Sequence, residues 1–204
     1  MKINNTKYKL NKDNYFEEMT KKTQILFKNS GFEDMRHYLG WQNRRSGTYK
    51  KTTPYSINEK GNIFEHYEPK HFGYLSGNLD LDSRLIVITM SNPGWLEKNN
   101  EDMFITWYGD IYNKGVFEKR WRNHVYWADY TNKQMESAAE LVGMLSKKFE
   151  ITPNCIGHNT KVDGIEYFDG IAYRSNYFSE RTDLSPAWDN EKFKNKIDFI
   201  TEEK

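Results

Sequence analysis

Apolar residues in this chain form one unusually continuous run. Residues 84–90 read Arg-Leu-Ile-Val-Ile-Thr-Met, which is typical of a strand buried on both faces of a parallel sheet. The run leads directly into Ser91, Asn92, Pro93 and Gly94, and Asn-Pro-Gly predicts a tight turn. We therefore expect a central strand that brings polar groups to one sheet edge, where α/β proteins bind ligands.

Helical periodicity is clearest over residues 132–149, where Met135, Ala138 and Val142 share one face. A second strand region is predicted over residues 164–173. Because a strand–helix–strand order forms a right-handed parallel crossover, both strands should end at the same sheet edge, and Asn92 and Arg174 should face one cleft. Further helices are predicted over residues 13–29, 33–39 and 185–200.

These elements predict an α/β fold: a three-layer sandwich with a small central, mostly parallel sheet flanked by helices. We expect residues 1–61 to form an N-terminal helical segment and a polar loop, the loop beginning at Trp41. Residues 62–204 should form the α/β core, the whole being one compact domain. Residues 101–123 are rich in aromatic side chains but lack a clear period, so they receive no assignment.

Composition narrows the class of protein. The 30 Lys and Arg residues nearly balance 29 Asp and Glu, for a formal charge of +1, so no global field attracts nucleic acid or an anionic membrane. Cys155 is the only cysteine, which excludes an internal disulfide and a cysteine-based zinc site. With a polar N-terminus and no long apolar run, we expect a cytoplasmic protein without a membrane partner.

Positive charge is nevertheless concentrated in the loop of residues 41–61. Arg44, Arg45, Lys50 and Lys51 alternate there with aromatic residues, in a chain that is 16% aromatic. Such a loop suits a phosphate backbone and unstacked bases, and these four residues are the nucleic-acid-binding candidates. The alternative is a solvated loop whose aromatic side chains anchor it to the core.

Asn92 is the candidate catalytic residue. A strand-end Asn can hold a water molecule through its carbonyl oxygen, and Gly94 lets the backbone approach a ligand closely. Neutral Asn is no strong base, so the suited reaction is attack on a carbon already rich in positive charge, as in N-glycosidic hydrolysis. The alternative is a plain turn.

Two other groups of residues are candidates for ligand or metal binding. Tyr173, Arg174 and Ser175 could contact phosphate or a base, or Arg174 could simply pair with a surface acid such as Glu180. His66 and its neighbours lack the regular spacing of a metal site, because Pro69 interrupts any helix there. We expect no metal and no cofactor.

The segment from Gly77 to Trp95 resembles the first motif of the uracil-DNA glycosylase superfamily, nearest to its mismatch-specific branch. Residues 166–168 and 172–175 resemble the middle strand of the same proteins. The resemblance implies a four-stranded parallel sheet, Asn92 positioning water and Phe104 stacking on an extruded base. The implied ligand-binding residues are Ser91, Gly94, Trp95, Phe104, Tyr173, Arg174 and Ser175.

The second catalytic motif of that family does not follow Arg181. We therefore expect a protein that binds a nucleobase, nucleotide or nucleic acid in a cleft at Asn92, without full glycosylase activity. Two alternatives stay open: an active N-glycosidic hydrolase, and an interaction protein that binds a defence or repair protein. The oligomeric state is also open.

Overall fold

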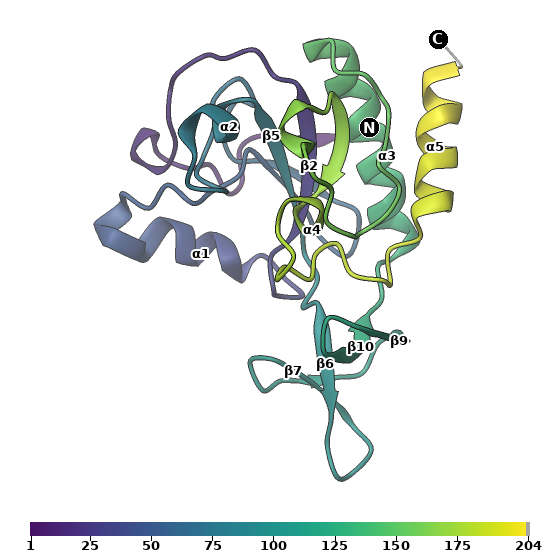
Figure 1. The fold of residues 1–204 in the computed structure, drawn as a ribbon. Helices are drawn as coiled ribbons and strands as arrows, with labels where there is room; N and C mark the ends of the chain where they lie inside the picture. The colour runs from purple at the N-terminus through teal and green to yellow at the C-terminus, as the bar shows by residue number, and fades with distance from the viewer. Residues whose placement is uncertain (203–204) are drawn as a thin grey trace.

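The computed structural model describes residues 1–202 and shows a mixed α/β fold built on two sheets (Figure 1). The main sheet has six strands in the order β1-β4-β3-β5-β2-β11, and the second sheet is antiparallel with the order β8-β7-β6-β10-β9. The main-sheet strands are β1 (Ile3–Asn4), β2 (Gln24–Asn29), β3 (Tyr55–Ile57), β4 (Ile63–Glu65), β5 (Leu85–Met90) and β11 (Gly170–Tyr173). Those of the second sheet are β6 (Trp95–Lys98), β7 (Phe104–Thr106), β8 (Ile111–Tyr112), β9 (Val116–Trp121) and β10 (His124–Ala128).

Strand β5 lies inside the main sheet, as the apolar run predicted. It pairs in parallel with β2 on one side and with β3 on the other, and β11 pairs in parallel with β2. All six residues of β5 are buried. The carboxyl ends of β3, β5, β2 and β11 therefore share one edge, which confirms that the segments following β5 and β11 open on the same side.

Helices cover both faces of the main sheet. The predicted helix over residues 132–149 is confirmed as α3 (Asn132–Phe149), which begins with a capping box between Thr131 and Gln134. It packs on one face with α5 (Asn190–Glu202) outside it (Figure 1). The remaining helices are α1 (Arg36–Asn43), α2 (Leu79–Ser83) and α4 (Arg174–Tyr177), and short 3-10 turns span Lys12–Asn14, Arg44–Gly47 and Ile165–Tyr167.

The predicted helix over residues 13–29 is wrong. Its last six residues form β2, in which Ile25, Leu26 and Phe27 are each 0% exposed. Ile25 and Phe27 face α3, whereas Leu26 packs with Leu85 on the opposite face. A short run that is apolar on both faces has no clear period, and burial in the sheet decided its conformation. Strand β3 likewise lies in the stretch predicted as loop.

The second sheet corrects the expected fold class. A mixed α/β architecture is present, but it has two sheets instead of one small parallel sheet. In Figure 1 the second sheet projects below the main sheet, at the edge where β5 ends. Its β9–β10 hairpin turns at Arg122 and Asn123, with φ of 45° and 66°, the pair of positive values that a type I′ turn requires.

Among the helices that the structure describes, none has the length and apolar character needed to cross a membrane.

Candidate functional site

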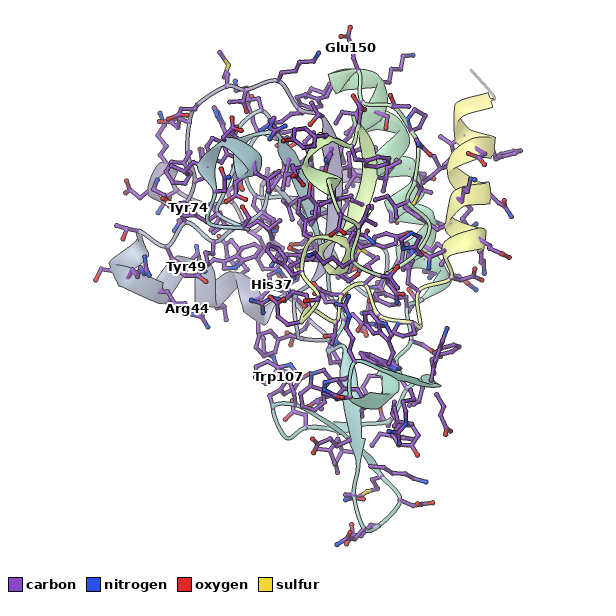
Figure 2. All side chains as sticks on the ribbon, in the orientation of Figure 1. His37, Arg44, Tyr49, Tyr74, Trp107 and Glu150 are labelled. Carbon is purple, nitrogen blue, oxygen red and sulfur yellow. The ribbon has the colours of Figure 1, made fainter. Side chains whose placement is uncertain are left out.

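A cleft of about 430 Å³ lies at the carboxyl edge of the main sheet, where the second sheet joins it. Three segments that are far apart in sequence meet there: the end of β2, the turn after β5, and the chain following β11. Figure 2 shows Trp107 at this junction. The lining residues are Lys28, Asn29, Ser30, Gly31, Pro93, Gly94, Trp95, Trp107, Arg174, Arg181, Thr182 and Asp183.

Lys28 is the cleft cation contributed by β2. Burial, with a further contribution from the positive charge of Arg174, lowers the pKa of its ammonium group to about 7. Its Nζ lies 5.9 Å from the centre of the Trp41 ring. Lys28 can therefore gain or lose its charge near neutral pH, which an exposed lysine does not do.

Asp183 holds the two sides of the cleft together. Its side chain is 3% exposed and accepts a hydrogen bond of 2.9 Å from Nε of Arg174. Its other oxygen accepts one of 2.8 Å from the backbone N–H of Asn29, at the end of β2. Breaking such a buried ion pair is costly, because it leaves one charge without its partner. The pair with Asp183 therefore holds the Arg174 guanidinium in place.

The cleft carries an excess of positive charge. Lys28, Arg174 and Arg181 line it, and Asp183 is the one carboxylate among its described lining residues. Arg181 also forms an exposed ion pair with Glu180 at 3.5 Å, an interaction that solvent screens strongly. Arg guanidinium groups bind carboxylates and phosphates through paired hydrogen bonds, so the site suits an anionic ligand.

Two indole rings, those of Trp95 and Trp107, also line the cleft. Trp107 donates a hydrogen bond of 2.7 Å from Nε1 to the carbonyl of Gly31 and is 48% exposed. Trp95 stacks on His124, with ring centres 4.5 Å apart and an interplanar angle of 12°. The cleft thus combines cationic side chains with the rings of Trp95 and Trp107, which we call its aromatic wall.

The structure gives the amide of Asn92 a structural role. Its Nδ2 donates to the carbonyls of Ala128 and Asp129, each at 3.1 Å, and its Oδ1 accepts from the N–H of Gly94 at 2.7 Å. These bonds tie the end of β5 to the return of the chain from the second sheet. Asn92 is 2% exposed and lines a neighbouring pocket, whereas Arg174 lines the cleft, so the two do not face one cavity.

The other sequence candidates separate into two groups. Gly94, Trp95 and Arg174 line the cleft. Three candidates are buried: Ser91 donates to the carbonyl of Asp34, the hydroxyl of Tyr173 contacts Cys155, and Ser175 is 0% exposed. Phe104 is partly buried and packs on Tyr126 within the second sheet.

The basic loop lies away from the cleft. Figure 2 shows Arg44 and Tyr49 beside the outer part of α1, at the left of the view, apart from Trp107 at the cleft. The Arg44 guanidinium lies 5.4 Å from the Tyr49 ring centre, and Lys50 donates to the carbonyl of Tyr15. Arg45 and Lys51 are exposed. This arrangement is that of a surface loop anchored by its aromatic residues.

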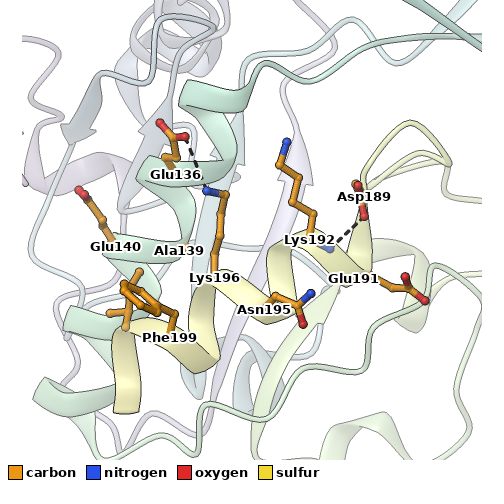
Figure 3. Close-up of a pocket in the computed structure, with 10 residues that line it drawn as sticks. Glu136, Ala139, Glu140, Asp189, Glu191, Lys192, Asn195, Lys196 and Phe199 are labelled. Carbon is orange, nitrogen blue, oxygen red and sulfur yellow. Dashed lines mark hydrogen bonds and ion pairs between the residues drawn. The ribbon is translucent and has the colours of Figure 1, made fainter. Parts of the chain in front are cut away.

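A larger cavity, of about 600 Å³, lies between α3 and α5 (Figure 3). Two ionic or polar contacts lie within it: Lys196 is 3.6 Å from Glu136, and Asp189 accepts from the backbone N–H of Lys192. It is remote from the carboxyl edge of the sheet, so the cleft is the stronger candidate. Within the described part of the chain, no three His, Cys, Asp or Glu side chains are grouped to hold a metal ion.

Sequence reasoning missed Lys28, Trp107, Arg181 and Asp183. The sequence did hold one signal for Lys28. The apolar residues 25–27 are followed directly by the polar segment Lys28-Asn29-Ser30-Gly31, just as the β5 run is followed by Ser91-Asn92-Pro93-Gly94. Treating both runs as buried strands would have placed Lys28 at the same edge. Trp107 and Asp183 stand in segments without a period and reach the cleft only through tertiary contacts.

Solved structures with a similar fold include N-acetylmuramoyl-L-alanine amidases. N-acetylmuramoyl-L-alanine amidase LysC from Clostridium intestinale superposes with a TM-score of 0.53 and 14% identity, covering 97% of this chain and 98% of that one. The catalytic domain of XlyA gives 0.55 and 13%, with 97% and 99% covered. The hydrolase AmiA from Staphylococcus aureus, solved with its ligand, gives 0.55 and 10%, with 98% and 83% covered. No curated protein sequence matches this chain.

The sequence profile of N-acetylmuramoyl-L-alanine amidases matches residues 14–169, more than half of the chain. This match and the shared fold overturn the resemblance to uracil-DNA glycosylases, and with it the expected binding of nucleobases or nucleic acid. The base-stacking role of Phe104 was implied by that resemblance and loses its basis. The water-positioning role of Asn92 was also argued from its place at a strand end, but its Oδ1 and Nδ2 are both bonded to backbone groups. The chain belongs to the N-acetylmuramoyl-L-alanine amidase family.

Proposed function

We propose that this chain binds the N-acetylmuramoyl peptide of peptidoglycan in the cationic cleft. The observation that carries the proposal is the gathering of Lys28, Arg174 and Arg181 at the ligand-binding edge of an amidase fold. Asp183 offsets one of these charges only, so an anionic group entering the cleft meets unbalanced positive charge.

Muramoyl peptides present the matching charge. The amidase AmiD from E. coli, which shares the fold with a TM-score of 0.54, was solved with anhydro-N-acetylmuramic acid-L-Ala-D-gamma-Glu-L-Lys. A glutamate linked through its γ-carboxyl keeps its α-carboxylate free, and the terminal residue adds a second carboxylate. In this chain, Arg181 and Lys28 are the cations suited to receive such groups, because Arg174 is committed to Asp183.

Calorimetric titration with N-acetylmuramoyl-L-Ala-D-γ-Glu-L-Lys tests the proposal. Arg181→Gln should weaken binding by about tenfold, because a hydrogen bond between charged groups is lost. The fold should persist, since this side chain is 53% exposed. Arg45→Gln, at an exposed position beside α1, is the matched control and should bind like the parent. No heat of binding, or equal affinities for both variants, would overturn the proposal.

Hydrolysis of the amide between the muramoyl group and L-alanine is the second candidate function, favoured by the family match. Such hydrolysis requires an activated water, which hydrolases commonly obtain from a zinc ion on three protein ligands or from a free general base. Asp183, the carboxylate of the cleft, already accepts two hydrogen bonds. The residues of the cleft therefore favour recognition over hydrolysis.

The two functions differ in a direct assay. The protein is incubated with the muramoyl tripeptide, with and without added zinc, and mass spectrometry follows the free L-Ala-D-γ-Glu-L-Lys peptide. Recognition without hydrolysis predicts binding by calorimetry and no released peptide. Catalytic release of peptide, lost in Asp183→Asn, would establish the amidase reaction instead.

A further inference from the structure

The aromatic wall of the cleft continues onto one face of the second sheet. In β9 and β10 the Cα partners are Trp121 with His124 and Phe117 with Trp127, so these four side chains share a face. Trp95 of β6 is the partner of Trp127 from the other side and lies on that face too. We define these residues, Trp95, Phe117, Trp121, His124 and Trp127, as the aromatic face.

Four rings of the aromatic face, those of Trp95, Trp121, His124 and Trp127, contact one another as a connected array. Trp127 is 0% exposed and lies at its centre, with Trp121 at 5.5 Å and His124 at 5.6 Å between ring centres. Phe117 at the outer end is 39% exposed. The array thus has a buried support and an accessible rim, which runs outward from Trp95 in the cleft.

The position of this face relative to the cleft is fixed by Arg122 at the hairpin turn. Its guanidinium donates to the carbonyls of Phe178, at 3.0 Å, and Ser175, at 3.2 Å, in the segment that follows Arg174. The same guanidinium lies 4.3 Å from the Trp121 ring centre. The hairpin is therefore held against the cation-bearing side of the cleft, and the aromatic face continues the cleft instead of moving independently.

We infer that the aromatic face binds the glycan chain of peptidoglycan, extending the muramoyl-peptide site by further sugar units. This inference rests on the proposed function for its ligand class. Pyranose rings expose C–H groups on one face, and these pack well on the electron-rich face of an indole. Anionic groups of the peptide would lie on Lys28 and Arg181, while neutral sugars would lie along the rings, so each part of the ligand meets the matching chemistry.

The experiment uses a neutral probe without peptide, the β-1,4-linked tetrasaccharide of N-acetylglucosamine, and records tryptophan fluorescence and calorimetric heats. The parent protein should bind it with little dependence on salt, because the probe carries no charge. Trp121→Ala should weaken binding by about tenfold, and Trp121→Phe should restore most of the loss. Phe199→Ala, which removes a 61% exposed ring on α5, should have no effect.

The muramoyl tripeptide serves as the second probe on the same proteins. It should bind Trp121→Ala as tightly as the parent, which shows that the variant is folded and that the cleft is intact. Failure of the tripeptide with retained tetrasaccharide binding would defeat the proposed function alone. No binding of the tetrasaccharide, equal binding by Trp121→Ala, or tighter binding of a single-stranded oligonucleotide would overturn the glycan inference.

Discussion

Single residues at the cleft have properties that their type alone does not give. Lys28 has its pKa lowered to about 7, first by burial and then by Arg174. Its charge is present in the folded protein below this pH and absent above it. The unfolded chain keeps the proton up to the ordinary lysine pKa near 10.4, so this residue makes stability rise with pH between the two values.

The same titration predicts a pH-dependent affinity. Binding of the muramoyl tripeptide should weaken by about tenfold between pH 6 and pH 8, because the charged fraction of Lys28 falls by that factor. Calorimetry across this range measures the effect, and Lys28→Met should bind weakly at both pH values. A parent protein with constant affinity from pH 6 to 8 would show that Lys28 does not contact the ligand.

Asn92 should matter for stability. Asn92→Ala leaves two carbonyls and the N–H of Gly94 without their partner, which should cost about 2–4 kcal/mol in the free energy of unfolding. Urea denaturation measures this loss. Asn99→Ala is the control: its side chain accepts from two backbone N–H groups in an exposed turn, where water replaces the bonds, so we expect less than about 1 kcal/mol. Equal losses would contradict the structural role.

At the scale of elements, Arg122 docks the β9–β10 hairpin on the segment that follows β11. Arg122→Ala removes the donors to Phe178 and Ser175, so the hairpin should open more often. Amide hydrogen exchange in residues 116–128 should accelerate by about tenfold, with no change in α3. Arg120→Ala, at an exposed position in β9, should leave exchange as it is. An unchanged rate in the Arg122 variant would mean that the turn holds the hairpin unaided.

The helices and strands also differ in how well the pattern of apolar residues predicts them. Residues 132–149 carry a full helical period, a capping residue at Thr131 and two lysines in the last turn, and they form the predicted helix. Strand β5 was equally clear because its run is continuous and bounded by a turn. Strand β2 was missed, since Ile25-Leu26-Phe27 is too short to show a period and follows a segment with helix-like spacing.

At the scale of the whole molecule, the second sheet has a small hydrophobic cluster of its own. The main core around β2, β5 and α3 includes none of its residues, whereas Leu96, Tyr112 and Ala128 form a separate small cluster. The two ends of the inserted segment meet, because the N–H of Ala128 donates to the carbonyl of Gly94 at 2.9 Å. The insertion can therefore be shortened without stretching the main sheet.

We predict that replacing residues 95–127 with a short Gly-Ser linker leaves a protein that unfolds cooperatively. The dependence of unfolding free energy on urea should fall in proportion to the surface removed, and far-UV circular dichroism should keep the α3 and α5 signal. Tetrasaccharide binding should disappear with the aromatic face. A shortened protein that is unfolded would show that the main sheet needs the second sheet for stability.

The sequence by itself determined the central buried strand, the long helix, and the sheet edge that the segments after β5 and β11 share. Burial on both faces and a regular helical period can be recognised from consecutive residues. The sequence also selected Gly94, Trp95 and Arg174, which line the cleft. The glycosylase resemblance was wrong because a hydrophobic strand ending in Asn-Pro-Gly is a local feature that different folds share. Tertiary structure alone decided that Lys28, Arg181 and Asp183 meet, and that Asn92 joins two sheets, since pairings between distant segments leave no periodic trace in the chain.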